Sequence, residues 1–237
     1  DADSEGQEGK FYCWTHEELS QLLAPEEFNV VARYFGITKA GNFVDHSHPN
    51  PLHGLNVLSI AKPLSGLDGP AAIDLLASAI KKMSDLRARR IRPHLDDKVL
   101  ASWNGLMLGA VARAYAVLGD ETYRAAAERN VAFLQARLWD VESSTLFHRW
   151  RDGERDHVQL LEAYAFLLDG VIQLFEATLE SEHLDFAIAL AEAVVAKFYD
   201  RENGGFWQSG ADAKDLILRV KDDYDGAEPS GNSVATL

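Results

Sequence analysis

The sequence predicts an all-α fold, a partial six-hairpin (α/α)6 toroid in which an inner layer of helices is enclosed by an outer layer. Mainly apolar helices alternate along the chain with helices that are apolar on one face only, which indicates two concentric layers. The alternation repeats, because Asn104-Gly105-Leu106-Met107 is matched 65 residues later by Asp169-Gly170-Val171-Ile172, and a third match begins at Asn232. Six hairpins of this length need more residues than the chain has, so we expect part of a toroid, as a single domain over 1–237.

Residues 1–69 are predicted to be a loop-rich segment that contains a pair of helices. A threonine followed three residues later by a glutamate opens a helix, a proline suits a first helical turn, and a glycine after the last turn closes one. The expected elements here are a strand at Lys10–Trp14, a helix opened by Thr15 and Glu18, and a helix from Pro25 to Phe35 closed by Gly36.

Residues 70–237 are predicted to carry the repeated helical hairpins. The segment from Val99 to Leu118 is so apolar that we expect its helix to be surrounded by protein, with no solvated face. The first expected helix covers 70–90 and turns Leu76, Ile80, Met83 and Leu86 toward a core. The first repeat is an inner helix over 97–118 and an outer helix over 121–138, whose apolar stripe is Tyr123, Ala127, Val131, Leu134 and Leu138. A hairpin Thr145–Trp150, turning at Asp152-Gly153, leads to a second inner helix over 160–179 and a second outer helix over 182–199, with short hairpins between the helices.

The composition indicates a globular protein and excludes several function classes. Hydrophobic residues make up 47% and charged residues 25% of the 237 residues, and the net charge is −14. Such an acidic chain is not expected to bind nucleic acid. Asn104 and Arg113 argue against a membrane span over 99–118. Cys13 is the single cysteine, which excludes an internal disulfide and favours a cytoplasmic location.

Three histidines in the loop-rich segment raise the question of a metal site. His46, His48 and His53 lie close together, but Asp45 is the one acidic residue beside them. We interpret this stretch as a solvated loop, and we expect neither a metal nor a cofactor.

Acidic residues gather where the inner helices are predicted to begin. Asp97 and Glu162 share the 65-residue offset, and Glu228 follows 66 residues later. Inner helices of a toroid run in the same direction, so their starts share one mouth, which would also bring Asp96, Asp223 and Asp225 together. Carboxylates beside an aromatic side chain are what acid/base chemistry on a glycosidic bond requires. We therefore predict a catalytic set of Asp97, Glu162, Asp223 and Glu228, and a substrate-binding set of His94, Asp96, Lys98, Trp103, Asn104, Tyr164, Asp225 and Asn232.

Two alternatives to this site stay open. The acidic residues could instead cap the inner helices, because carboxylates satisfy the free N–H groups of a first turn. Sugar epimerisation would use a base, often a histidine, and His94 and His157 both precede inner helices.

Four motifs in order resemble one known family. They are Asp1–Ser4 with Glu8–Tyr12, Arg92–Met107, Leu161-Glu162 with Tyr164–Phe166, and Arg219–Ser233. Together they are similar to the thioredoxin-domain-containing family that includes spermatogenesis-associated protein twenty. The resemblance implies a six-hairpin (α/α) barrel like those of N-acylglucosamine epimerases and six-hairpin glycosidases, preceded by a thioredoxin-like domain that this chain lacks, with the last hairpins also missing. Ala163 stands where the family usually has an acidic residue, and Glu162 could serve in its place.

Taken together, these observations predict a small-molecule substrate, a sugar, acted on by glycosidase-like or sugar-epimerase-like acid/base chemistry. The alternative is a non-catalytic binding or redox-partner module for an adjoining thioredoxin-like domain.

Overall fold

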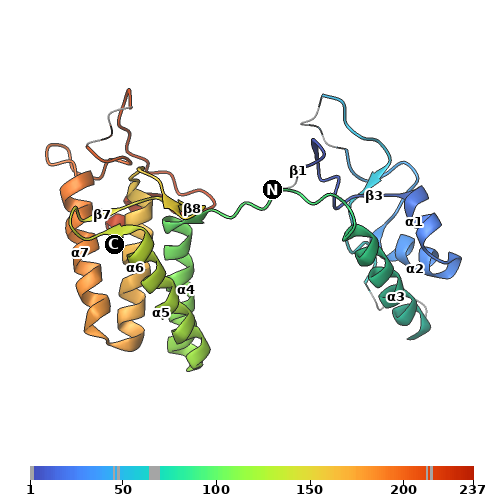
Figure 1. Cartoon of the computed structure of the whole chain (residues 1–237), viewed down its shortest axis with the longest axis horizontal. Helices are drawn as coiled ribbons and strands as arrows, with labels where there is room; N and C mark the ends of the chain where they lie inside the picture. Colours follow the sequence, from blue (N-terminus) through green and yellow to red (C-terminus); the bar gives the residue numbers. More distant parts are fainter. Residues whose placement is uncertain (1–2, 45, 47–48, 64–69, 212, 214–215) are drawn as a thin grey trace. The chain divides into compact units, whose positions relative to one another are not determined.

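The computed structural model describes residues 3–44, 46, 49–63, 70–211, 213 and 216–237. The chain forms two compact units, residues 1–96 and 97–237 (Figure 1). Each unit has its own hydrophobic core. The boundary falls inside the polar stretch that precedes the first apolar helix, and not at residue 69, where the repeated hairpins were expected to start. A single toroid domain over the whole chain stays a prediction.

In its described residues, the first unit combines short strand pairs with three helices. Its elements are β1 (Asp3–Ser4), β2 (Gln7–Glu8), β3 (Trp14–Thr15), α1 (His16–Leu22), α2 (Pro25–Phe35), β4 (Leu55–Asn56) and α3 (Pro70–Arg87). β1 pairs with β2 and β3 pairs with β4, both antiparallel. The helix boundaries are those that the caps predict: the Thr15 hydroxyl accepts the Glu18 N–H at 3.1 Å, and Gly36 adopts a left-handed conformation with φ 68° after α2.

The strand predicted at Lys10–Trp14 is wrong except at its last residue. The N–H groups of Tyr12 and Cys13 both donate to the carbonyl of Gly9, so this stretch turns back on itself. The apolar run there reflects burial of Phe11 and Cys13 and not a strand.

Helix α3 packs in the core of the first unit against α1 and α2 and is not part of the repeated hairpins. Leu76 and Met83 are buried as predicted, whereas Ile80 is exposed and Ala79 takes its place in the core. A buried carboxylate fastens α3 to α2: Glu27 accepts hydrogen bonds from Lys82 at 2.8 Å and from Ser78 at 2.7 Å. The bond with Lys82, more than any other contact, lowers the pKa of Glu27 to about 2.

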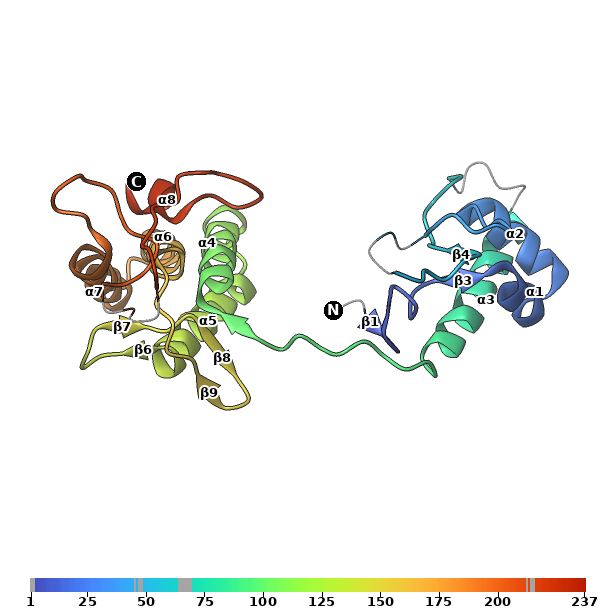
Figure 2. The same cartoon turned by 90° about the horizontal axis from the view of Figure 1, so that it is seen from above.

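The second unit contains two successive helical hairpins with short strand pairs at one end. Its elements are β5 (Val99–Leu100), α4 (Ala101–Leu118), α5 (Glu121–Arg137), β6 (Trp139–Asp140), β7 (Thr145–Leu146), β8 (Arg149–Arg151), β9 (Glu154–Arg155), α6 (Leu161–Thr178), α7 (Ser181–Phe198) and α8 (Gly231–Ala235). Figures 1 and 2 show α4 to α7 side by side. Helix α6 lies between α4, α7 and α8. These neighbours make α4, α6 and α8 the inner helices and α5 and α7 the outer ones, so the predicted fold class is confirmed.

The strands differ from the prediction in detail. The hairpin predicted at Thr145–Trp150 is divided between two sheets, because β7 pairs with β6 while β8 pairs with β5 and β9. The predicted turn at Asp152-Gly153 joins β8 to β9, and both of its residues have positive φ, as a two-residue hairpin requires. The pairing of β5 with β8 also delays α4, which begins at Ala101 and not at residue 97.

Two inner helices touch at their backbones through glycines. A Cβ atom at Gly105 would lie 2.5 Å from the backbone N of Leu167, and one at Gly170 would lie 2.5 Å from the carbonyl O of Gly105. The repeated Asn/Asp-Gly dipeptide of the sequence is therefore a packing contact between α4 and α6.

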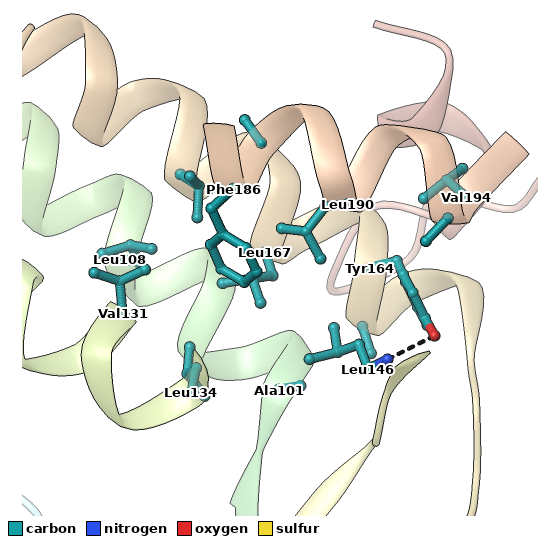
Figure 3. Close-up of a cluster of buried hydrophobic side chains, with 14 of the residues drawn as sticks. Ala101, Leu108, Val131, Leu134, Leu146, Tyr164, Leu167, Phe186, Leu190 and Val194 are labelled. Carbon is teal, nitrogen blue, oxygen red and sulfur yellow. Dashed lines mark hydrogen bonds between the residues drawn. The ribbon is translucent and has the colours of Figure 1, made fainter. Parts of the chain in front are cut away.

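The outer helices cover α4 and α6 with their apolar stripes. Val131 and Leu134 of α5 and Phe186 and Leu190 of α7 point into one cluster with Leu167 of α6 (Figure 3). Burying such side chains contributes about 1.5–3 kcal/mol each. Tyr123, predicted on the same stripe, is 36% exposed instead.

The prediction that the first apolar helix has no solvated face is wrong for the described chain. On α4, Trp103, Met107 and Val117 are 62%, 61% and 76% exposed. The helix is mainly apolar, and among the described helices α5 and α6 pack most extensively against it. Across the described residues, no helix combines the length and apolar character needed to cross a bilayer.

Candidate functional site

A cavity of about 500 Å³ opens at the start of α6 in the second unit. Its walls come from α4, the first turn of α6, the long segment after α7 and the first residues of α8. The side chains that matter for chemistry are Trp103, Glu162, Asp222, Tyr224, Glu228 and Asn232. Four of these six, Trp103, Glu162, Glu228 and Asn232, were predicted from the sequence.

Backbone contacts fix the position of Glu162 at this cavity. The N–H of Leu161 donates to the carbonyl of Gln208 at 2.9 Å. A Cβ atom at Gly231 would lie 3.1 Å from the backbone N of Glu162, so α8 begins in close contact with α6. Glu162 is the second residue of α6 and therefore lies where the segment after α7 crosses the helix start.

The segment after α7 is held in place by two anchors. Lys221 donates to Asp200 at 2.7 Å and to the carbonyl of Gly204 at 2.6 Å, and its ammonium lies 4.6 Å from the ring centroid of Trp207. Asn232 is the second anchor: its amide accepts from the Phe206 N–H at 2.8 Å and donates to the carbonyls of Phe206 and Asp222. These contacts hold residues 221–232 against residues 200–207 and so position one wall of the cavity.

The carboxyl group of Glu162 stands in an environment that opposes its charge. Burial raises the pKa of Glu162, and the negative charges of Glu228 and Asp222 raise it further, whereas His148 lowers it. Desolvation and like charges both favour the protonated form. Glu162 is thus a half-buried carboxyl group beside two exposed acidic side chains, and this environment favours its protonated form.

Two aromatic side chains stand at the cavity and are largely exposed. Trp103 is 62% and Tyr224 is 78% exposed. Exposed aromatic faces beside hydrogen-bonding groups can pack against the apolar face of a small polar molecule.

Asp97 does not line the cavity, although it shares the repeat position of Glu162. Its carboxylate pairs with the Arg151 guanidinium at 2.8 Å. The two repeats differ in phase, because α6 already includes Glu162 whereas α4 begins four residues after Asp97. The expectation that both carboxylates meet at one mouth is therefore not met.

The other predicted charged residues also lie apart from the cavity lining. Asp225 accepts the Ser230 N–H at 2.8 Å, which lowers the pKa of Asp225 and identifies it as a turn-forming residue. Asp223 and Lys98 are exposed and do not line the cavity. His94 and Asp96 belong to the first unit.

Two predicted substrate ligands are structural residues instead. Tyr164 is fully buried, and its hydroxyl accepts the Leu146 N–H at 2.7 Å (Figure 3). Asn104 donates to the carbonyl of Leu100 and accepts from Asn130 of α5, both at 2.8 Å. Their hydrogen bonds tie α6 to β7 and α4 to α5. Ala163, like Tyr164, is fully buried in the core, so Glu162 is the acidic side chain that this motif brings to the cavity.

The histidine-containing loop offers no assembled metal site in the described residues. Asp45 and His48 lie outside them, and no group of three or more metal-ligating side chains is found among the rest. His53 lines a separate cavity of about 500 Å³ in the first unit, together with Cys13 and Arg90. His157 is exposed and packs edge-on against Phe147.

Sequence reasoning missed Asp222, Tyr224 and His148. The first two lie inside the motif Arg219–Ser233 and could have been chosen from it, but nothing in the local pattern separates them from Asp223 and Asp225. His148 lies between β7 and β8, in no repeat and in no motif. Its proximity to Glu162 depends on how the strand pairs fold over the helix starts.

Comparison with known proteins identifies the family. The chain is 38% identical to human spermatogenesis-associated protein 20 over 254 residues, covering 96% of this chain, and 37% identical to the mouse protein over 255 residues, covering 97%. The chain belongs to the spermatogenesis-associated protein 20 family. It spans about one third of the length of these relatives, 32% in both cases. No family model matches the chain, and the thioredoxin-like domain stays a prediction.

Solved structures with a similar arrangement of helices include sugar-processing enzymes. Cellobiose 2-epimerase from Bacillus thermoamylovorans is 19% identical, with a TM-score of 0.48, and the match covers 59% of this chain and 37% of that one. A family 105 glycoside hydrolase from C. acetobutylicum is 10% identical, with a TM-score of 0.48, over 70% of this chain and 50% of that one. Similarity at this level carries no conclusion about the activity of the spermatogenesis-associated protein 20 family.

Proposed function

We propose that the cavity at the start of α6 binds a carbohydrate and that Glu162 and Glu228 act there as an acid–base pair. The observation that carries this proposal is the environment of Glu162. A half-buried carboxyl group, whose pKa is raised by burial and by Glu228, shares a cavity with a more exposed carboxylate. Two carboxyl groups in unequal environments divide into a proton donor and a proton acceptor.

The same pair fits both reaction types that the fold class suggests. In glycoside hydrolysis, the acid protonates the departing oxygen as the C–O bond breaks, while the carboxylate removes a proton from the water that attacks. In epimerisation, a base removes the proton at the carbon beside an open-chain carbonyl, and an acid returns a proton to the opposite face. Glu162 is the proposed acid in hydrolysis, because its environment favours the protonated form.

The remaining cavity side chains suit a neutral polyol. Trp103 and Tyr224 offer apolar surfaces to a sugar ring, and Asp222 offers hydrogen-bond acceptors to hydroxyl groups. Asn232 contributes to the wall but its amide is engaged by backbone groups, so we assign it to positioning and not to substrate contact.

The direct test is a product assay on the protein with neutral oligosaccharides and aldoses in deuterated water. Hydrolysis creates new reducing ends, whereas epimerisation incorporates solvent deuterium at the inverted carbon. We expect Glu162→Gln and Glu228→Gln each to lower the rate by roughly 10²–10⁴-fold, the usual contribution of a general acid or base. Glu142→Gln changes an exposed hairpin carboxylate away from the cavity and is the matched control. A Glu162→Gln variant with the full rate would overturn the assignment.

A further inference from the structure

The first unit contains a cavity of its own, with a volume of about 500 Å³. Its lining residues come from the segments 4–18, 52–55 and 89–91. The apolar part of this lining is Phe11, Cys13, Leu52, Leu55 and Ile91. Binding sites for small molecules usually have a volume of about 300–1,000 Å³ and combine apolar walls with a few polar groups. This cavity therefore has the size and the character of a site for a small molecule.

The Arg90 side chain holds the walls of this cavity in place. Its guanidinium donates to the carbonyls of Phe11 and Cys13, both at 2.8 Å, and to the Glu18 carboxylate at 2.6 Å. The same guanidinium lies 4.0 Å from the ring centroid of the buried Trp14. These contacts fasten the residues that follow α3 to the stretch before α1. The cavity is therefore formed before a ligand arrives, and a preformed site loses little conformational freedom on binding.

The lining has more cationic than anionic side chains. Its two carboxylates are each neutralised in an ion pair, Glu5 with Lys10 at 2.8 Å and Glu18 with Arg90 at 2.6 Å. Arg89 and His53 also line the cavity and are exposed. Neither side chain has an ion-pair or hydrogen-bond partner among the residues that the structure describes. The charge of Arg89 is thus offset by no carboxylate, beside an imidazole that can donate a hydrogen bond, although the whole chain has a net charge of −14.

We propose that this cavity binds a small organic anion, whose carboxylate pairs with Arg89 and whose apolar group packs against Phe11 and Leu55. A guanidinium holds a carboxylate through two parallel hydrogen bonds, and the apolar walls favour a ligand with an apolar body. An amine would meet Arg89 as a like charge. The site uses no residue of the cavity at Glu162, so it goes beyond the proposed function and does not depend on it.

The test uses three probes that share one aromatic ring and differ in charge: phenylacetate, phenylacetamide and phenethylamine. Their affinities for the whole chain are measured by isothermal titration calorimetry. We expect phenylacetate to bind on the order of tenfold more tightly than phenylacetamide, because a charge-assisted hydrogen bond is stronger than a neutral one. Phenethylamine should bind most weakly. No binding of phenylacetate, or equal binding of its amide, would overturn the proposal.

Cys13 reports whether the probe occupies this cavity. It is the single cysteine of the chain, is 3% exposed and belongs to the lining. Burial raises the pKa of its thiol, so alkylation by the uncharged reagent iodoacetamide should be slow. Phenylacetate should slow it further, both in the wild type and in Glu162→Gln, since a bound ligand disfavours opening of the site. Alkylation at an unchanged rate with phenylacetate bound would place the ligand elsewhere and reject the site.

Arg89→Gln tests the assigned cation. Because Arg89 is exposed, this variant should fold, bind phenylacetate on the order of tenfold more weakly and bind phenylacetamide as the wild type does. Arg87→Gln is the matched control, because Arg87 is the last residue of α3 and is not part of the lining. Wild-type affinity of Arg89→Gln for phenylacetate would refute the role of Arg89.

A second variant decides the question if Arg89→Gln does not fold. Leu52 is a wall residue that is 37% exposed, so Leu52→Asp places a negative charge at the cavity without opening the core. This charge should weaken the binding of phenylacetate more than that of phenylacetamide. Equal effects on the two probes would contradict an anion site.

Discussion

Glu162 is the residue at which burial, like charge and helix start act together. The first turn of a helix favours a carboxylate, but burial and the charges of Glu228 and Asp222 outweigh this and raise the pKa. A carboxyl group whose folded-state pKa is raised stabilises the folded state below its unfolded pKa, and this stabilisation is lost as the pH rises through the folded value.

We therefore expect Glu162→Gln to stabilise the protein at neutral pH. Glutamine keeps the shape of the side chain and removes a charge that the folded state opposes. The gain should be at most about 1 kcal/mol, or about 2–4 °C in melting temperature, because the side chain is only half-buried. It should vanish below about pH 4, where the unfolded-state carboxyl is also protonated. Thermal melts of Glu162→Gln and Glu142→Gln across pH 4–8 check this, and a lower melting temperature at neutral pH would contradict it.

Glu27 in the first unit should show the opposite pH dependence. Its pKa is lowered to about 2 by Lys82 and Ser78, so its contribution is complete above about pH 4.5 and is lost as the pH falls toward 2. We expect Glu27 to contribute about 1–2 kcal/mol to the free energy of unfolding. This is less than its pKa shift alone would imply, because the Lys82 side chain is 46% exposed and solvent screens the pair. Glu27→Gln should lower the free energy of unfolding at pH 6 and make it depend less on pH in the acid range. An unchanged pH dependence would refute the role of Glu27.

Among the elements, α4 and α6 depend on glycine where they touch. Gly105→Ala would place a methyl group 2.5 Å from the backbone of Leu167, which cannot move without displacing α6. We expect a loss of about 1–3 kcal/mol or more in urea unfolding. Gly109→Ala is the matched comparison, because its nearest neighbour is the amide end of the Gln173 side chain at 2.9 Å, which can rotate. Equal losses for the two variants would show that the close crossing is not the cause.

The segment after α7 should loosen when its anchor is removed. Lys221, more than any other contact, lowers the pKa of Asp200. We expect Asp200→Asn to release Lys221 and to speed hydrogen exchange at the Gln208 N–H, which donates to the carbonyl of Val220, on the order of tenfold. Asp185→Asn, on the exposed face of α7, should leave this amide unchanged. Unaltered exchange in Asp200→Asn would mean that the wall is held by other contacts.

Local chemistry in the sequence predicted most helix boundaries. The caps at Thr15 and Gly36 act within one turn, and the apolar stripe through Val131 and Leu134 reports which face of α5 is buried. Periodicity could not show that α4 would keep an exposed face with Trp103, because exposure depends on which elements pack beside a helix.

The site was predicted in part, for a related reason. Glu162, Glu228 and Trp103 follow from the repeat, since each lies at or near the start of an inner helix. Asp97 shares the repeat position but does not line the cavity, because β5 pairs with β8 and α4 begins only after Asp97. Tyr224 reaches the site through the long segment between α7 and α8, and no short-range pattern encodes its position.

For the whole molecule, the negative net charge indicates which class of sugar the cavity should prefer. The net charge is −14, and the cavity adds Glu162, Asp222 and Glu228 in one place. Acidic sugars would meet this field unfavourably, so we expect neutral sugars to bind in preference to the matching uronic acids.

The most direct measurement is a thermal-shift screen of the protein against neutral sugars and their uronic acid counterparts. A ligand that binds only the folded state raises the melting temperature. We predict a rise with at least one neutral sugar, a smaller rise with its uronate, and loss of the effect in Trp103→Ala. Met107→Ala, on the same exposed face of α4 but outside the cavity, should behave as the wild type. No shift with any sugar, or a preference for uronates, would contradict a carbohydrate site at this cavity.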